Sequence, residues 1–183
     1  MQTTYEIDRS LEDKFALAVK GCLAQVFMRK RESADLEDAQ DFAIYRAQPF
    51  SVGVRLRRFQ FYNPVFRRQF TIRYHRPGDI LTEIDKIRAG KVDYIFYGFL
   101  GPNAGHIIQF FVGDLRYFME PEPTPIRVFW NDPPDSELAV YQVDQFPPQF
   151  IVAYWNNPNC PGGAPSSCPS LDTISEFRRG VKN

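Results

Sequence analysis

Cysteine and histidine are scarce in this sequence, and each shortage excludes a class of protein. Three cysteines in 183 residues are too few for a disulfide scaffold, although Cys160 and Cys168 could pair under oxidising conditions. The spacing of these two cysteines fits no usual zinc pattern, and the only histidines are His75 and His106. We therefore expect no structural zinc site.

Long apolar runs and an excess of charge are also missing. No stretch of about 18 apolar residues occurs, so we expect no membrane span. Residues 1–6 lack the basic and apolar regions of a secretory signal, which favours a cytoplasmic protein. Lys+Arg and Asp+Glu both number 22, so the net charge gives no global argument for nucleic acid. A local argument remains, because the basic residues cluster.

Apolar and aromatic residues are plentiful, at 44% and 15% of the chain, and predict one domain with a core rich in rings. Residues 9–28 have the spacing of a helix, which Asp8 or Ser10 could cap. The apolar face of this helix would consist of Leu11, Phe15, Ala18, Cys22 and Val26. A charged connection over 29–38 and a short strand over 41–46 would follow.

Alternation of side chains predicts a strand over 50–58. Val52, Val54 and Leu56 would lie on one face of it, and Arg55 and Arg57 on the other. This strand would thus have an apolar face and a basic one.

Residues that favour turns and helix ends divide the next part of the chain into short elements. An aromatic hairpin tip over 59–68 would lead to a strand over 69–74. A helix over 80–89 would be capped by Asp79 and stopped by Gly90. Residues 92–99 are so apolar that we expect a strand buried on both faces.

The second half is less regular. Residues 106–118 fit either a strand followed by a helical turn or one short helix. Prolines surround an expected edge strand over 126–130, and apolar segments follow over 140–150 and 150–155. A loop over 156–170 and a short helix over 171–179 would end the chain. The expected organisation is a core over 1–118, a proline-rich β extension packed on it over 119–155, and a loop with a short helix over 156–183.

From residue 9 to 99 the expected order is helix, two or three strands, helix, strand. This order resembles the core of the PD-(D/E)XK, or restriction-endonuclease-like, superfamily. The resemblance implies an α/β (α+β) fold in which helices flank a central mixed sheet, with the core order α-β-β-β-α-β and a β-rich C-terminal extension. Members of this superfamily often carry a Glu on the first helix, an Asp at the start of one strand and an acid-x-Lys pair on the next. The carboxylates hold Mg²⁺, and the Lys positions the attacking water.

Two of these positions match by residue type. Glu12 matches the Glu of the first helix, and Asp41, with Asp38 as a competitor, matches the strand-start Asp. The third position has Arg55-x-Arg57 instead of acid-x-Lys. Glu83 and Lys86 lie three apart on the second expected helix, and could supply the missing pair from there. The resemblance thus implies a catalytic Mg²⁺ site. Its metal ligands would be Glu12, Asp41 and Glu83, and Lys86 would be a catalytic residue beside them.

Each of these residues also has an ordinary structural explanation. Glu12 could complement the helix dipole, Asp41 could be a solvated turn residue, and Glu83 with Lys86 could form a surface ion pair. Residues 79–118 also look like phage-type or mobile-element members of the group, in which a Thr-Glu helix precedes a Tyr-Gly strand and an Asp-Leu-Arg segment. The residues concerned are Thr82, Glu83, Lys86, Asp93, Tyr97, Asp114 and Arg116.

Among these residues, Asp93 would need a partner if its strand is central, because a buried carboxylate must be paired or hydrogen-bonded. Lys86 or Arg73 could serve as that partner.

Arginines alternate with aromatic residues between positions 55 and 76. Guanidinium groups grip phosphate, and aromatic faces stack on unpaired bases. The predicted phosphate contacts are Arg55, Arg57, Arg58, Arg67, Arg68, Arg73 and Arg76. The alternative is a solvated strand face that pairs with the acids of 32–41.

Three functions fit these features. The first is nucleic-acid binding, to DNA rather than RNA, with Mg²⁺-dependent cleavage. The second is a non-catalytic binding or adaptor protein, and the Arg55-x-Arg57 replacement favours it. The third is a protein-interaction module that uses the proline-rich region 120–148. A homodimer or a protein partner is compatible with each.

Overall fold

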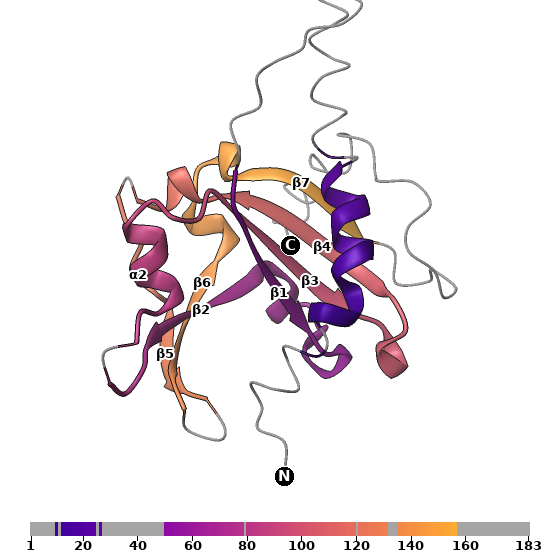
Figure 1. Cartoon of the computed structure of the whole chain (residues 1–183), viewed down its shortest axis with the longest axis horizontal. Coiled ribbons are helices and arrows are strands. Elements are labelled where there is room, and N and C mark those ends of the chain that lie inside the picture. Colours follow the sequence, from indigo (N-terminus) through magenta and orange to yellow (C-terminus); the bar gives the residue numbers. More distant parts are fainter. Residues whose placement is uncertain are drawn as a thin grey trace, which may run out of the picture.

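A computed structural model describes residues 10, 12–24, 26, 50–78, 80–119, 121–131 and 135–156. These residues form three layers: an N-terminal helix, a four-stranded sheet, and a three-stranded sheet accompanied by a short helix (Figure 1). Within this part of the chain, no helix is long and apolar enough to cross a membrane.

The four-stranded sheet is mixed, with the strand order β1-β3-β4-β7. Parallel pairing joins β1 to β3, and antiparallel pairing joins β3 to β4 and β4 to β7. Its strands are β1 (Val52–Arg57), β3 (Tyr94–Leu100), β4 (Ile107–Asp114) and β7 (Ile151–Asn156).

The three-stranded sheet is antiparallel and has the order β2-β6-β5. Its strands are β2 (Gln69–His75), β6 (Glu137–Gln142) and β5 (Arg127–Trp130), and the helix α2 (Glu83–Arg88) contacts β2. Short 3-10 turns complete the fold: η1 (Phe59–Phe61), η2 (Phe66–Arg68), η3 (Pro102–Ala104), η4 (Leu115–Phe118), η5 (Val143–Gln145) and η6 (Pro148–Phe150).

The N-terminal helix covers one face of the four-stranded sheet (Figure 1). Phe15, Cys22 and Val26 are buried as their spacing predicted, Ala18 is half-buried, and Val19 joins them. They pack on the side chains of the sheet that point the same way, among them Leu56 and Phe96. An apolar cluster therefore joins the helix to the sheet.

A second, larger core fills the space between the two sheets. Ile95, Tyr97 and Phe99 of β3 face it, since alternate residues of a strand point to opposite faces. Phe70 and Tyr141 approach from the other sheet, and ring contacts cross the layer, such as Phe70 to Tyr97 with centroids 6.2 Å apart. The aromatic-rich core predicted from composition thus lies mainly between the sheets.

The helix α2 begins later than its sequence pattern predicted. Its N-cap is Thr82 rather than Asp79, because the Thr82 Oγ and Asp85 form a capping box in which Asp85 accepts the Thr82 N–H at 2.8 Å. Ile80, the first residue of the predicted helix, is therefore outside the helix and exposed. Gly90 ends the helix as predicted, with the positive φ of 63° that glycine tolerates.

The coarse fold class is confirmed: the chain is mixed α/β and contains a mixed sheet. The expected order α-β-β-β-α-β within one sheet is not confirmed, because β1 and β2 lie in different sheets. Strands from both 1–118 and 119–155 share each sheet, since β7 pairs with β4 and β6 with β2.

Local expectations are resolved where the chain is described. Residues 106–118 form a strand followed by a helical turn, and residues 127–130 form an edge strand. The expected strand over 41–46, the loop over 156–170 apart from residue 156, the helix over 171–179 and the pairing of Cys160 with Cys168 lie outside the described residues.

Candidate functional site

The two arginines of β1 point into the space between the sheets. Arg55 lies beside Tyr97 and Arg57 beside Phe99 in the register of β1 and β3, and both β3 residues belong to the inter-sheet core. The sequence correctly placed both arginines on one face of the strand. It did not show that the second sheet lies opposite that face, and Arg55 is consequently buried rather than part of a basic surface.

The positive charge of Arg55 is balanced by a carboxylate inside the protein. Its Nη2 pairs with Oε1 of Glu83, whose Oε2 accepts the backbone N–H of Arg73 at 2.8 Å. Burial by itself lowers the pKa of Arg55, but the negative charges of Glu83 and Glu12 outweigh it, and the net pKa is raised. The guanidinium group therefore remains charged and is held by Glu83.

The described residues do not fit the Mg²⁺ site that the resemblance implied. Both oxygens of Glu83 already accept hydrogen bonds from the protein, and the cation beside Glu83 is a guanidinium. Glu12 is half-buried and attracts the same guanidinium. Asp41 lies outside the described residues. Among the residues that are described, no group of three His, Cys, Asp or Glu side chains could hold a metal ion.

Glu83 and Lys86 line a cavity of about 210 Å³, together with Arg55 and apolar side chains such as Ile87 and Leu115. Glu83 and Lys86 therefore lie on the same side of α2, as their spacing predicted, and this side faces the cavity. Glu83, however, pairs with Arg55 rather than with Lys86. An acid that is already paired with a strongly basic group is poorly placed to take a proton or to bind a metal.

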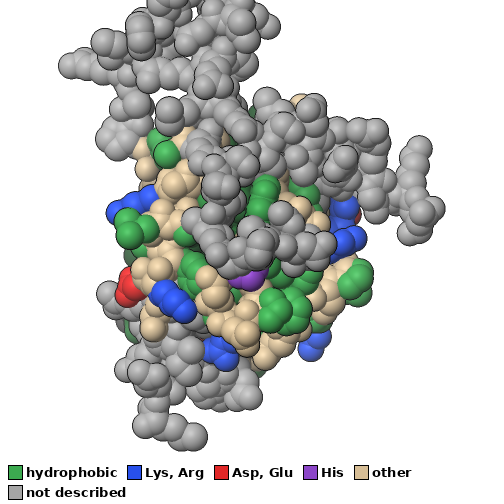
Figure 2. Space-filling view, turned by 90° about the vertical axis from the view of Figure 1, so that its right-hand side faces the viewer, with side chains coloured by type: hydrophobic (Ala, Val, Ile, Leu, Met, Phe, Trp, Pro, Cys, Tyr) green, Lys and Arg blue, Asp and Glu red, His purple; other side chains and the backbone are tan. Residues whose placement is uncertain are grey.

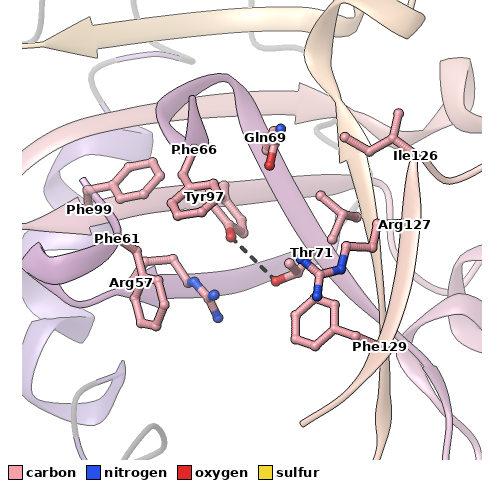
Figure 3. A pocket seen from close by; sticks show the side chains of 11 residues that line it. Arg57, Phe61, Phe66, Gln69, Thr71, Tyr97, Phe99, Ile126, Arg127 and Phe129 are labelled. Carbon is pink, nitrogen blue, oxygen red and sulfur yellow. Dashed lines mark hydrogen bonds between the residues drawn. The ribbon is translucent and has the colours of Figure 1, made fainter. Parts of the chain in front are cut away.

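A larger cavity, of about 350 Å³, lies next to Arg57 and between the two sheets (Figure 3). Its lining residues come from β1, β2, β3, β5, β6 and the turns after β1: Arg57, Phe61, Phe66, Gln69, Thr71, Tyr97, Phe99, Ile126, Arg127, Phe129 and Val140. Five of these eleven residues are aromatic, so flat apolar rings form much of its wall.

Arg57 and Arg127 lie on opposite sides of this cavity, with the hydroxyl groups of Thr71 and Tyr97 between them (Figure 3). The Arg57 guanidinium carbon is 4.4 Å from the Phe61 ring centroid, and that of Arg127 is 5.2 Å from Phe129. In the described part of the chain, neither arginine forms an ion pair with a carboxylate. These two cations are thus available to an anionic ligand.

The other predicted phosphate contacts are less available. Arg68 pairs with Asp144, and Arg73 Nε donates a hydrogen bond to Ser136 Oγ at 3.2 Å. Arg67 is an exception, because its described hydrogen bond, from Gln109 Nε2 at 2.8 Å, is to the backbone oxygen and does not involve the guanidinium group. Arg58 and Arg76 are half-buried and engaged in interactions of their own. The predicted pairing with acids of 32–41 falls on residues outside the described part.

Acids from the phage-like segment also have partners that the sequence did not indicate. Asp93 accepts the backbone N–H of Ser51 at 2.7 Å and its hydroxyl at 2.9 Å, which lowers the pKa of Asp93. The partner of Asp93 is therefore Ser51, and not Lys86 or Arg73 as predicted. Asp114 is buried and pairs with Arg116 at 2.5 Å. These contacts are structural links between neighbouring segments.

Arg127 and Phe129 are the site residues that sequence reasoning missed. They lie on β5, which the sequence indicated only as an edge strand among prolines, and no local pattern links residue 127 with residue 57. Figure 2 shows the side of the molecule that lies to the right in Figure 1, where Lys and Arg side chains are visible in several places among the described residues.

Comparison with known proteins leaves the family open. No family model, no curated protein and no solved structure matches the chain. The resemblance to the PD-(D/E)XK superfamily therefore stays a prediction.

Proposed function

We propose that this protein binds single-stranded nucleic acid, DNA rather than RNA, and that it does not cleave the strand it binds. The observation that carries the proposal is the pair Arg57 and Arg127, which come from different sheets, flank one aromatic cavity and have no carboxylate partner among the described residues. A guanidinium group donates two parallel hydrogen bonds to a phosphate, which suits both residues to the backbone of a nucleic acid.

Exposed aromatic rings in the turns after β1, of which Phe66 lines the cavity, support an unpaired rather than a duplex ligand. Phe59 and Phe66, in the turns after β1, are 45% and 43% exposed. Rings on a surface give up apolar contact with water when a base stacks on them, and every base offers a face for stacking. In a duplex these faces are already stacked on one another.

The contacts of Glu83 support the proposal of binding without cleavage. Its two oxygens hold Arg55 and the backbone of Arg73, so this acid contributes to the fold. A metal ion would have to compete with a buried guanidinium for the same carboxylate. The second alternative from the sequence, a binding protein without catalysis, is therefore the one that this arrangement favours.

The test is the association of labelled single strands, followed by fluorescence anisotropy at several salt concentrations. Because two phosphates would be neutralised, log K should fall with log salt with a slope of roughly −1.4. The double variant Arg57→Ala/Arg127→Ala should lose binding. Arg88→Ala removes one positive charge from the pair of Arg88 with Glu122, away from the cavity, and should bind normally.

Several results would contradict the proposal. Equal affinity of the double variant and the wild type would show that the two arginines are not the site. Tighter binding of duplex than of single strands would contradict the role of the exposed rings. Cleavage of the strand with Mg²⁺ that is lost in Glu83→Gln would overturn binding without cleavage. If no nucleic acid binds at all, the protein-interaction alternative takes precedence.

A further inference from the structure

The interior of the cavity between the sheets specifies the class of ligand more closely than its two arginines alone. Resting on the proposed function, we infer that the cavity accepts one unpaired nucleobase, that Arg57 and Arg127 hold the phosphates next to it, and that Thr71 and Tyr97 contact the polar edge of the base. A mononucleotide supplies the base and one of these phosphates, and is the smallest ligand that tests the cavity.

The size of the cavity supports one base per site. At about 350 Å³ it lies near the lower end of the range of small-molecule sites, roughly 300–1,000 Å³. A ligand of this size is a single nucleotide unit. A second base would have to lie outside, against exposed rings such as Phe66.

The wall suits a flat ligand. Rings from both layers line the cavity, among them Phe99 of the four-stranded sheet and Phe129 of the three-stranded sheet. Figure 3 shows the rings of Phe61 and Phe66 on the side of Arg57, and the ring of Phe129 on the side of Arg127. A base that lies between such rings gains stacking on its faces and loses little conformational freedom, because it is itself rigid.

The hydroxyl groups inside the cavity supply polar contacts. Thr71 Oγ1 and the Tyr97 hydroxyl are 3.4 Å apart, and both residues are buried. An O–H···O hydrogen bond usually spans about 2.5–3.0 Å, so their mutual contact is weak and can give way to a ligand. The polar edge of a base offers donors and acceptors that would satisfy both hydroxyl groups, whereas a hydrocarbon chain would leave them unpaired.

The combination also distinguishes a base from simpler anions. A free phosphate would engage the arginines but leave the aromatic wall uncovered. An uncharged aromatic compound would cover the wall but leave Arg57 and Arg127 without an anion. The cavity thus complements a ligand that combines a flat polar-edged ring with phosphate beside it.

The inference is tested by competition and by direct calorimetry on the full chain. The four 5′-mononucleotides should displace a labelled single strand and should bind by themselves, whereas ribose 5-phosphate, which has no base, should do neither. Thr71→Val and Tyr97→Phe should each weaken mononucleotide binding about fivefold, the effect of one lost hydrogen bond. Tyr117→Phe, at an exposed tyrosine on η4, is the matched control.

The outcomes separate this inference from the proposed function. If single strands bind through Arg57 and Arg127 but mononucleotides neither bind nor compete, the cavity inference is wrong and the proposed function stands. If ribose 5-phosphate binds as well as a mononucleotide, or Thr71→Val and Tyr97→Phe change nothing while their melting temperatures equal that of the wild type, the inference is also wrong. If mononucleotides bind and single strands do not, the proposed function fails and the cavity inference stands.

Discussion

Arg55 and Arg57 are two residues apart on β1 and share one face of the strand, yet their surroundings differ. Arg55 is buried against Glu83 and attracts Glu12. Arg57 stacks on Phe61 beside an open cavity and has no carboxylate partner among the described residues. The comparison teaches that two identical residues on the same face of one strand can differ, one being part of the core and the other lining a candidate binding site.

The physical difference lies in what faces each arginine. A buried charge must be paired and hydrogen-bonded, so Arg55 stabilises the structure only as long as Glu83 is present. A half-exposed guanidinium keeps part of its hydration and needs no carboxylate partner before a ligand binds. Substitutions on the Arg55 side should therefore change stability, and substitutions on the Arg57 side should change binding.

The largest effect on stability is expected from Glu83→Gln, which leaves Arg55 buried without its counter-charge. Breaking a fully buried pair costs about 3–5 kcal/mol, but 36% of the Glu83 side chain is exposed, so we expect about 2 kcal/mol. Urea denaturation measures the loss in free energy of unfolding. Adding Arg55→Met should restore part of the stability. A further loss in the double variant would show that the pair is not the cause.

A smaller effect is expected from Arg57→Ala. Its described stabilising contact is the stacking on Phe61, and a cation–π contact at a partly exposed site contributes about 0.5–1 kcal/mol. The same denaturation series should therefore show a loss below about 1 kcal/mol, while the affinity for single strands falls. A loss as large as that of Glu83→Gln would remove the distinction between the two arginines.

The smallest effect concerns pH and the helix that carries Glu83. Hydrogen bonds from the side chain and the backbone of Thr82 lower the pKa of Asp85. A carboxyl group whose folded-state pKa is lowered contributes stability above its unfolded pKa of about 4, and this contribution is lost as the pH falls through the folded value. The free energy of unfolding, measured from neutral to acid pH, should decline less steeply in Asp85→Asn. Equal slopes would contradict a role for Asp85 in holding α2.

Local periodicity made much of the fold predictable. The N-terminal helix, β1, β2 and β3 were indicated by side-chain spacing, which depends only on residues near one another in the chain. The start of α2 was misplaced because an Asp at position 79 and a Thr at position 82 are both acceptable caps, and the contact of Thr82 with Asp85 decided between them. Residues 106–118 were ambiguous because apolar residues occupy both faces of β4.

The candidate site was predictable only in part, because its contacts are not local. Arg57 was named from its strand pattern, but its counterpart Arg127 is far along the chain and on the other sheet. The pairing of Arg55 with Glu83 joins residues 28 positions apart. The superfamily resemblance implied that Glu83 is a metal ligand, whereas in the structure it holds a guanidinium and a backbone N–H.

By itself the sequence determined that Arg55 and Arg57 point to the same side of a strand, because alternation is a property of the extended backbone. The tertiary structure decided that α2 brings Glu83 to one of them, while β5 brings Arg127 across a cavity from the other. The reason is that the environment of a charge depends on which distant segments pack against it. No pattern along the chain reports that packing.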